Sequence, residues 1–289
     1  MEMEYPFGKG PVKLVSTGWL EENMDSALKL DTQPDVHDYI TEHLPGSVFM
    51  QERFLMCHGK GRPTAYSPAS LVEQMFRKVG LKPDMPVLVY TGKGAFKGWG
   101  DGLAQTMLAY SLARFGHEKI YVLDGGIDAW KAEGKKLSQE FPEVEESDFS
   151  VKERKDEFAI DMEGVKAEKD KEDTILLDAR PSKVYEGQGP WMKPGHIPGA
   201  VCLPWKSLME EENPQKLKPL EEVKSILESK GVTEDKQVIC SCGTSREATN
   251  EFVLLRFYLG YPNVKIYEGS FTEWSSYPDN PTVTGPEPL

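Results

Sequence analysis

The chain has 289 residues, of which 28% are charged, and its formal net charge is -13 at pH 7. This acidic balance excludes a broad phosphate-binding surface, because proteins bind nucleic acids mainly through Lys and Arg. A mean hydropathy of -0.49, together with the lack of any run of about 18 apolar residues, argues against a membrane protein. The chain starts with acidic residues instead of a basic and then apolar signal, so we expect a cytoplasmic protein.

Four cysteines stand at positions 57, 202, 240 and 242. They are too few and too unevenly spaced for a disulfide framework, so we expect reduced thiols. For Cys57 and Cys202 we expect roles as small core residues. The sequence predicts neither a metal site nor a bound cofactor.

An internal repeat supports two domains, which the length of 289 residues already favours. Gly80–Thr91 aligns without gaps with Gly231–Cys242, so that Thr91 corresponds to Cys242. Each segment is a turn followed by a short run rich in β-branched residues, which predicts a buried parallel strand. Two further pairs of segments keep the same order along the chain: Glu42–Val48 with Gly195–Val201, and Gly116–Gly126 with Gly260–Ser270.

Strands alternate with helical stretches in both halves, which predicts the α/β class: two tandem domains, each a mostly parallel sheet flanked by helices. The domains are placed at residues 10–137 and 155–289, with the charged stretch Glu143–Asp148 as a solvated linker. A helix is predicted over Glu247–Leu259. Its apolar stripe comprises Ala248, Phe252, Leu255 and Leu259.

Cys242 stands where a predicted parallel strand ends and a helix is about to begin. Free backbone N–H groups and the positive end of the helix are expected to face its sulfur. Together with Arg246 they would lower the pKa of the thiol and favour the thiolate, which is the nucleophilic form. Gly243, Thr244 and Ser245 are small or hydroxyl-bearing, which suits a loop whose N–H groups turn inward.

Several segments around this loop stand in a characteristic order: Leu177–Arg180, Tyr185–Gly187, Gly195–Val201, Cys242–Glu247 and Tyr267–Trp274. Together they resemble the tandem rhodanese family, which includes thiosulfate and 3-mercaptopyruvate sulfurtransferases. The resemblance covers nearly the whole chain and keeps the order of the motifs.

The resemblance implies a sulfur transfer in two steps. The Cys242 thiolate attacks the outer sulfur of thiosulfate or 3-mercaptopyruvate, becomes a persulfide, and passes that sulfur to cyanide or a thiol. No cofactor other than this covalent persulfide is implied, and neither nucleic acid nor membrane is an expected partner. The donor is a small anion, and the residues expected to bind it are Gly243, Thr244, Ser245, Arg246, Glu247 and Lys193.

The first domain is expected to be catalytically silent, as is usual in the family. Thr91 replaces the nucleophile there, and a hydroxyl without a neighbouring base is a poor substitute for a thiolate. The loop after Thr91 is longer than the loop after Cys242. Its segment Lys93–Trp99 either closes over the other domain's site or is a plain exposed loop.

Donor choice stays open at this point. Known members often carry an Arg just before the Tyr-x-Gly segment, where this chain has Val184 beside Lys183. Arg246 and Lys193 would have to supply the missing positive charge.

Three residues near the site are expected to be structural. The resemblance implies that Asp178 is the last residue of a strand near the site and that Arg180 anchors the loop. His196 lies in a Pro-Gly turn, where a hydrogen-bonded scaffold residue is more usual than a base.

Two other functions are open on the residues alone. Cys240 and Arg246 have five residues between them, which is the spacing of cysteine-dependent phosphatases. The repeat, however, places Cys240 inside a strand instead of at its carboxyl end. The other alternative is a sulfur carrier or redox sensor, because Cys240 and Cys242 share one face of a strand. Cys240 would then resolve an oxidised Cys242, whereas the plainer interpretation of Cys240 is buried packing.

Overall fold

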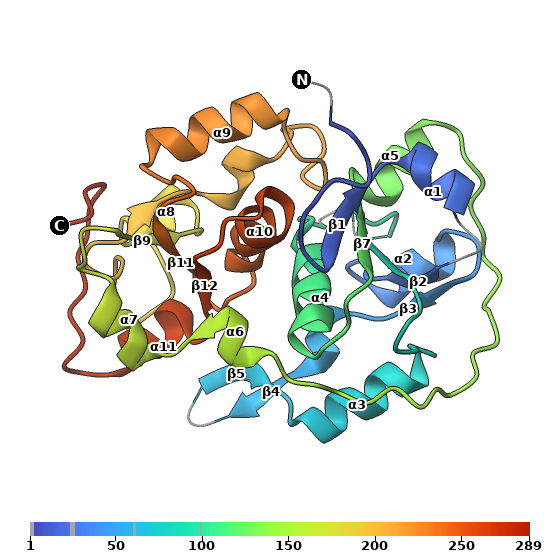
Figure 1. Cartoon of the computed structure of the whole chain (residues 1–289), viewed down its shortest axis with the longest axis horizontal. Helices are drawn as coiled ribbons and strands as arrows, with labels where there is room; N and C mark the ends of the chain where they lie inside the picture. The colour runs from blue at the N-terminus through green and yellow to red at the C-terminus, as the bar shows by residue number, and fades with distance from the viewer. Residues whose placement is uncertain (1–2, 24–26, 60–61, 97, 99) are drawn as a thin grey trace.

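The first half of the chain folds around a five-stranded parallel sheet of order β1-β7-β6-β2-β3 (Figure 1). The computed structural model describes residues 3–23, 27–59, 62–96, 98 and 100–289. An antiparallel hairpin, β4-β5, extends from this half. The elements are β1 (Val12–Val15), α1 (Thr17–Asn23), β2 (Leu28–Asp31), α2 (Val36–Thr41), β3 (Ser47–Phe49), η2 (Glu52–Leu55), β4 (Met56–Gly59), β5 (Arg62–Tyr66), α3 (Ala69–Lys78), β6 (Val87–Tyr90), α4 (Leu103–Arg114), β7 (Ile120–Leu123) and α5 (Gly126–Ala132).

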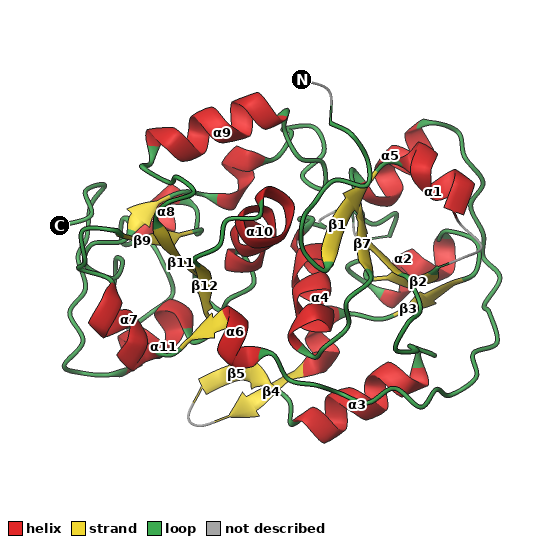
Figure 2. Cartoon of the chain, in the orientation of Figure 1, coloured by secondary structure: helices red, strands yellow, loops and turns green. Residues whose placement is uncertain are grey.

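The second half has its own five-stranded parallel sheet, of order β10-β9-β11-β12-β8 (Figure 2). Its elements are α6 (Lys155–Phe158), β8 (Ala159–Ile160), α7 (Met162–Glu168), β9 (Thr174–Asp178), α8 (Ser182–Tyr185), β10 (Val201–Cys202), η3 (Trp205–Leu208), α9 (Leu220–Ser229), β11 (Gln237–Ser241), α10 (Ala248–Phe252), η4 (Val253–Leu259), β12 (Val264–Tyr267) and α11 (Ser270–Ser276).

The two sheets share one topology, which confirms the predicted repeat and the α/β fold. β8, β12, β11, β9 and β10 take the places of β1, β7, β6, β2 and β3. One hydrogen bond in each half fixes the register. The Ile127 N–H donates to the Thr91 carbonyl over 2.9 Å, and the Phe271 N–H donates to the Cys242 carbonyl over 2.9 Å. Thr91 and Cys242 therefore occupy equivalent positions.

The halves meet through α4 and α10, which lie side by side at the centre of the molecule (Figure 1). All 12 residues of α4 are buried. A helix that is apolar or small on every side has no face suited to water, so it packs best inside the protein. Ala104, Ala109 and Ala113 are such small apolar residues of α4. One hydrophobic cluster extends around α4 through both halves of the chain.

The polar side chains of α4 find partners across the interface. The Gln105 Nε2 donates to the Gln215 carbonyl over 3.1 Å, and the Thr106 and Thr249 hydroxyl oxygens are 3.3 Å apart. The Arg114 Nε donates to the Glu268 carboxylate over 2.6 Å. Buried polar groups need such partners because water is excluded from them.

The helix predicted over residues 247–259 exists, but its second part is wider than an α-helix. α10 ends at Phe252 and continues as a π-helical stretch, η4, which Gly260 ends in a left-handed conformation (φ 78°). The wider turns shift the later positions around the axis. As a result Phe252 and Leu255 are buried, whereas Leu259 is only half-buried.

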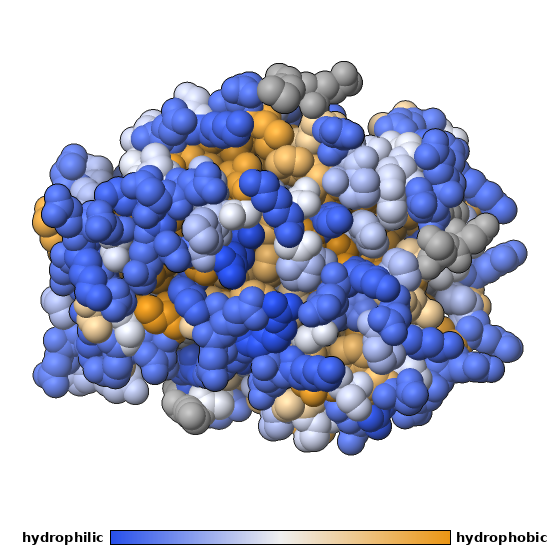
Figure 3. Space-filling model, viewed as in Figure 1, coloured by the Kyte–Doolittle hydropathy of each residue, from blue (hydrophilic) through white to orange (hydrophobic). Residues whose placement is uncertain are grey.

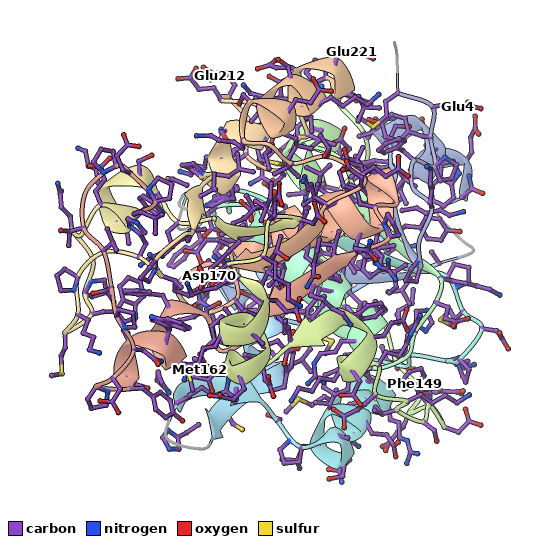
Figure 4. The ribbon with its side chains drawn as sticks, turned by 60° about the vertical axis from the view of Figure 1, so that its left-hand side comes forward. Glu4, Phe149, Met162, Asp170, Glu212 and Glu221 are labelled. Atoms are coloured by element: carbon purple, nitrogen blue, oxygen red, sulfur yellow. The ribbon has the colours of Figure 1, made fainter. Side chains whose placement is uncertain are left out.

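The linker residues 143–148 are exposed except for the half-buried Ser147. The chain is nevertheless anchored there, because the Ser147 N–H donates to the Arg77 carbonyl over 3.1 Å. Phe149, the first residue after the linker (labelled in Figure 4), is 2% exposed and packs edge-on against Phe76. The linker thus runs along the first half as part of its surface.

Hydrophilic side chains dominate the face shown in Figure 3. Across the described residues no helix combines the length and the apolar character needed to cross a membrane.

Phe252 tests how far the interface stabilises the fold. It is fully buried, and its ring packs edge-on against Tyr110 and Phe257. Phe252→Ala is expected to lower the free energy of unfolding by about 3–5 kcal/mol, because it removes apolar contacts and leaves a cavity. Urea unfolding measures this loss. Phe141→Ala is the matched control, since Phe141 is 60% exposed. Equal losses in both variants would contradict the prediction.

Candidate active site

Cys242 directly follows β11 and precedes α10, so its side chain lies at the carboxyl edge of the second sheet. The thiol is fully buried. The backbone N–H groups of Thr244 and Ala248 face the sulfur and act to lower the pKa of the thiol. The loop curls this way because Ser245 adopts a left-handed conformation (φ 66°), which is unusual for a residue other than glycine. This arrangement is compatible with the predicted turning of loop N–H groups towards the sulfur.

Ser270, the first residue of α11, holds the Cys242 loop in place through hydrogen bonds. Its hydroxyl oxygen accepts hydrogen bonds from the N–H groups of Cys242 (3.3 Å) and Ser245 (3.1 Å) and donates to the Tyr267 carbonyl (2.9 Å). The same oxygen lies 3.9 Å from the Cys242 sulfur. The sequence analysis gave Ser270 no role, although it marks the end of one repeated segment.

Burial raises the pKa of the Cys242 thiol well above its usual value, and the charge and hydrogen bond of Glu247 raise it further. The N–H groups of Ala248 and Thr244 oppose this rise but do not outweigh it. The expectation of a lowered pKa for the Cys242 thiol is therefore wrong. The reason is that a carboxylate and an apolar core, instead of Arg246, surround the sulfur.

Arg246 turns away from Cys242 towards the first half of the chain. Its Nε donates to Glu52 over 3.0 Å, and its terminal nitrogens bind both oxygens of Asp101, one of them over 2.9 Å. It lines a hollow of about 30 Å³ together with Thr91. Such a space holds roughly one water molecule. Sequence spacing placed Arg246 beside the thiol, but carboxylates distant in the chain hold its guanidinium.

Lys193 does not offer a free positive charge either. Its ammonium group donates to the carbonyls of Tyr277 (2.7 Å), Pro278 (2.7 Å) and Asn280 (2.8 Å). These three bonds use the three donors of the ammonium group. In the structure Lys193 anchors the C-terminal segment, and its expected role in substrate binding stays a prediction.

Asp178 and Arg180 form a buried ion pair beside the loop, with 2.6 Å between the Arg180 Nη2 and the Asp178 Oδ2. The Arg180 Nη2 also donates to the Gly195 carbonyl over 2.9 Å. The guanidinium lies over the Phe271 ring, 4.2 Å from its centroid. These contacts tie together segments around the loop.

The corresponding residues of the first half are Asp31 and Gln33. The Gln33 Nε2 donates to Asp31 over 3.0 Å and to the Glu42 carbonyl over 2.9 Å, as Arg180 does to its own partners. Without a cation at this position, burial raises the pKa of Asp31 to about 6. The sequence carries this signal, because Asp31-Thr32-Gln33 aligns with Asp178-Ala179-Arg180.

Thr91 is buried, and its hydroxyl donates to the Thr32 carbonyl over 2.9 Å. A segment of the second half covers this edge of the first sheet, since the Gln215 carbonyl accepts the Gly125 N–H over 3.1 Å. The long loop after Thr91 also contacts the second half, where Lys93 donates to the carbonyl of Glu212 over 2.7 Å. Residues 97 and 99 of the predicted closing segment lie outside the described residues.

Cys240 lies inside β11, where it pairs with Leu177 on one side and Ile266 on the other, and it is fully buried. Burial raises the pKa of its thiol well above the usual value. Cys57, by contrast, is exposed on β4, so the expectation that it packs in the core is wrong. Cys202 is half-buried.

His196 stacks on Tyr185, with ring centroids 3.6 Å apart, and its Nδ1 lies 3.1 Å from the Tyr185 carbonyl. These are the contacts of a scaffold residue. In the described part of the chain, no three His, Cys, Asp or Glu side chains gather in a way that could hold a metal ion.

The rhodanese-like domain model matches residues 16–133 and again residues 161–277. The chain therefore belongs to the rhodanese family and carries two rhodanese-like domains in tandem. Its similar proteins include named sulfurtransferases, and the chain is a member of this sulfurtransferase family.

One similar protein, from Synechococcus elongatus and provisionally named a thiosulfate sulfurtransferase, is 36% identical over 96% of this chain and 86% of its own length. The 3-mercaptopyruvate sulfurtransferase of Escherichia coli K12 is 28% identical over 92% of this chain and 96% of its own length. Among solved structures, the anaerobic ergothioneine biosynthesis enzyme of Chlorobium limicola has a TM-score of 0.80 at 21% identity. That match covers 94% of this chain and 70% of that enzyme, and it shows the shared fold.

The carboxylate beside the sulfur has a measurable consequence. Glu247→Gln is expected to lower the pKa of Cys242, because a neighbouring negative charge disfavours the thiolate. The rate of iodoacetamide alkylation against pH, in a Cys57→Ser/Cys202→Ser background, gives the midpoint. Glu234→Gln, at an exposed position, is the control. A midpoint that stays in place or rises in the Glu247 variant would refute the assignment.

Proposed function

We propose that the protein transfers a sulfane sulfur from thiosulfate or 3-mercaptopyruvate, through a persulfide on Cys242, to cyanide or a thiol. The observation that carries this proposal is the setting of the Cys242 sulfur. It stands at the carboxyl end of a parallel strand, and the N–H groups of Thr244 and Ala248 face it. Donors of this kind stabilise a negative charge on sulfur in a site without water.

The first step needs the thiol proton to leave. The Glu247 carboxylate, which accepts a hydrogen bond from the thiol, is the group that takes it. The sulfur then attacks the outer sulfur of the donor, and a new S–S bond forms. With thiosulfate the old S–S bond breaks and sulfite leaves with the bonding pair. With 3-mercaptopyruvate a C–S bond breaks, and the leaving enolate takes up a proton to give pyruvate.

The second step regenerates the enzyme. Cyanide or an acceptor thiolate attacks the outer sulfur of the persulfide, which gives thiocyanate or an acceptor persulfide. The Cys242 thiolate leaves, where the Thr244 and Ala248 N–H groups stabilise it. The first half contributes no second nucleophile in this proposal, because the Thr91 hydroxyl donates its hydrogen to the Thr32 carbonyl.

The relatives support the class of reaction, since their names include both thiosulfate and 3-mercaptopyruvate sulfurtransferases. A phosphatase reaction at Cys240 is disfavoured, because that residue lies within β11, whereas Cys242 follows its carboxyl end. The cytoplasmic location stays a prediction, and the four free thiols are compatible with it.

Incubation with each donor, followed by intact mass measurement and cyanolysis, tests the proposal. We expect a gain of one sulfur atom, confined to Cys242 and released by cyanide as thiocyanate. Cys242→Ser should gain none, whereas Cys240→Ser, the matched control, should gain as much as the wild type. No gain with either donor would exclude sulfur transfer. Loss of the gain in Cys240→Ser alone would move the nucleophile to Cys240.

A further inference from the structure

The three cationic side chains described above each have an anionic or carbonyl partner. Arg246 is held by Glu52 and Asp101, and Arg180 is held by Asp178. Lys193, the remaining cation expected to bind the donor, is held by three carbonyls. Glu247 adds a negative charge next to the sulfur. An anionic donor therefore meets a site in which these predicted cations are not free.

The two carboxylates that hold Arg246, those of Glu52 and Asp101, both belong to the first half of the chain, and we call this pair the clamp. Glu52 has a side chain only 5% exposed, so its charge is weakly screened, while Asp101 is 37% exposed. Arg53 lies 3.8 Å from Glu52, but its side chain is 63% exposed and reaches into solvent. Two carboxylates thus face Arg246 from the other half and outweigh its single charge.

Asp101 and Arg246 hold each other in their charged forms. Burial alone would raise the pKa of Asp101, but the hydrogen bond and the charge of Arg246 outweigh burial and lower it. Both Asp101 and Arg246 are therefore charged at neutral pH. Breaking this contact needs a competing anion of comparable strength or the removal of a carboxylate.

Building on sulfur transfer through Cys242, we propose that Glu52 and Asp101 determine the donor preference by holding Arg246 away from the sulfur. Thiosulfate carries two negative charges, whereas 3-mercaptopyruvate carries one carboxylate. One negative charge stays at the site, on Glu247 before the proton transfer and on the Cys242 sulfur after it, and its repulsion acts about twice as strongly on a dianion as on a monoanion. With Arg246 held by Glu52 and Asp101, the site therefore prefers a singly charged donor. Release of Arg246 would let its guanidinium bind a doubly charged donor.

The test measures kcat/KM for sulfur loading of Cys242 from thiosulfate and from 3-mercaptopyruvate. Wild-type protein should prefer 3-mercaptopyruvate. Asp101→Asn should raise the ratio of thiosulfate to 3-mercaptopyruvate about tenfold, mainly through a lower KM for thiosulfate, because one charged hydrogen bond becomes available. Adding Arg246→Gln to Asp101→Asn should remove the gain. Glu146→Gln, at an exposed ion pair with Lys78, is the control and should leave the ratio unchanged.

Several results would overturn the proposal. A wild-type preference for thiosulfate, an equal loss with both donors in Asp101→Asn, or a gain that persists without Arg246 would each assign the clamp a purely positional role. Glu52→Gln provides a second variant if Asp101→Asn does not fold. Failure of the underlying sulfur transfer is distinct, since the wild type would then load Cys242 from neither donor.

Discussion

The burial of α4 between the two halves is the constraint on which the rest of the structure depends. The helix has no exposed side, so each half completes the core of the other. Its polar side chains then require partners that only the second half supplies, such as Glu268 for Arg114. This fixes the relative position of the halves, and with it the meeting of Arg246 with Glu52 and Asp101. A contact far in sequence from the nucleophile thus follows from the packing of one helix.

The fold could be predicted because it rests on local patterns. The run before Thr91 and the run before Cys242 are short, apolar and preceded by turns, and both form central parallel strands. The same register distinguished Cys242 from Cys240, because counting along a strand decides which residue lies at its end. Backbone geometry of this kind is encoded over a few residues.

The side chains of the site were harder to predict, for a physical reason. Arg246 and Lys193 are long, and their charged ends reach groups that no local pattern places near them, such as Asp101 and the Tyr277 carbonyl. Proximity in sequence fixes where such a side chain starts but not where it ends. The prediction of a lowered thiol pKa was wrong for the same reason, because the pKa of Cys242 depends on the Glu247 carboxylate and on apolar packing around the sulfur. Cys57 was misjudged because its exposed hairpin leaves the first sheet.

The covered edge of the first sheet has a consequence for the duplicated domain. Gln215 from the second half packs over Gly125 and Gly126, and its carbonyl bonds to the Gly125 N–H. The place where a substrate would approach Thr91 is thus filled by the protein's own chain. This edge of the first sheet thus serves to join the two halves. A cysteine introduced by Thr91→Cys would lie beneath this contact, so a second reaction centre would also require the two halves to separate.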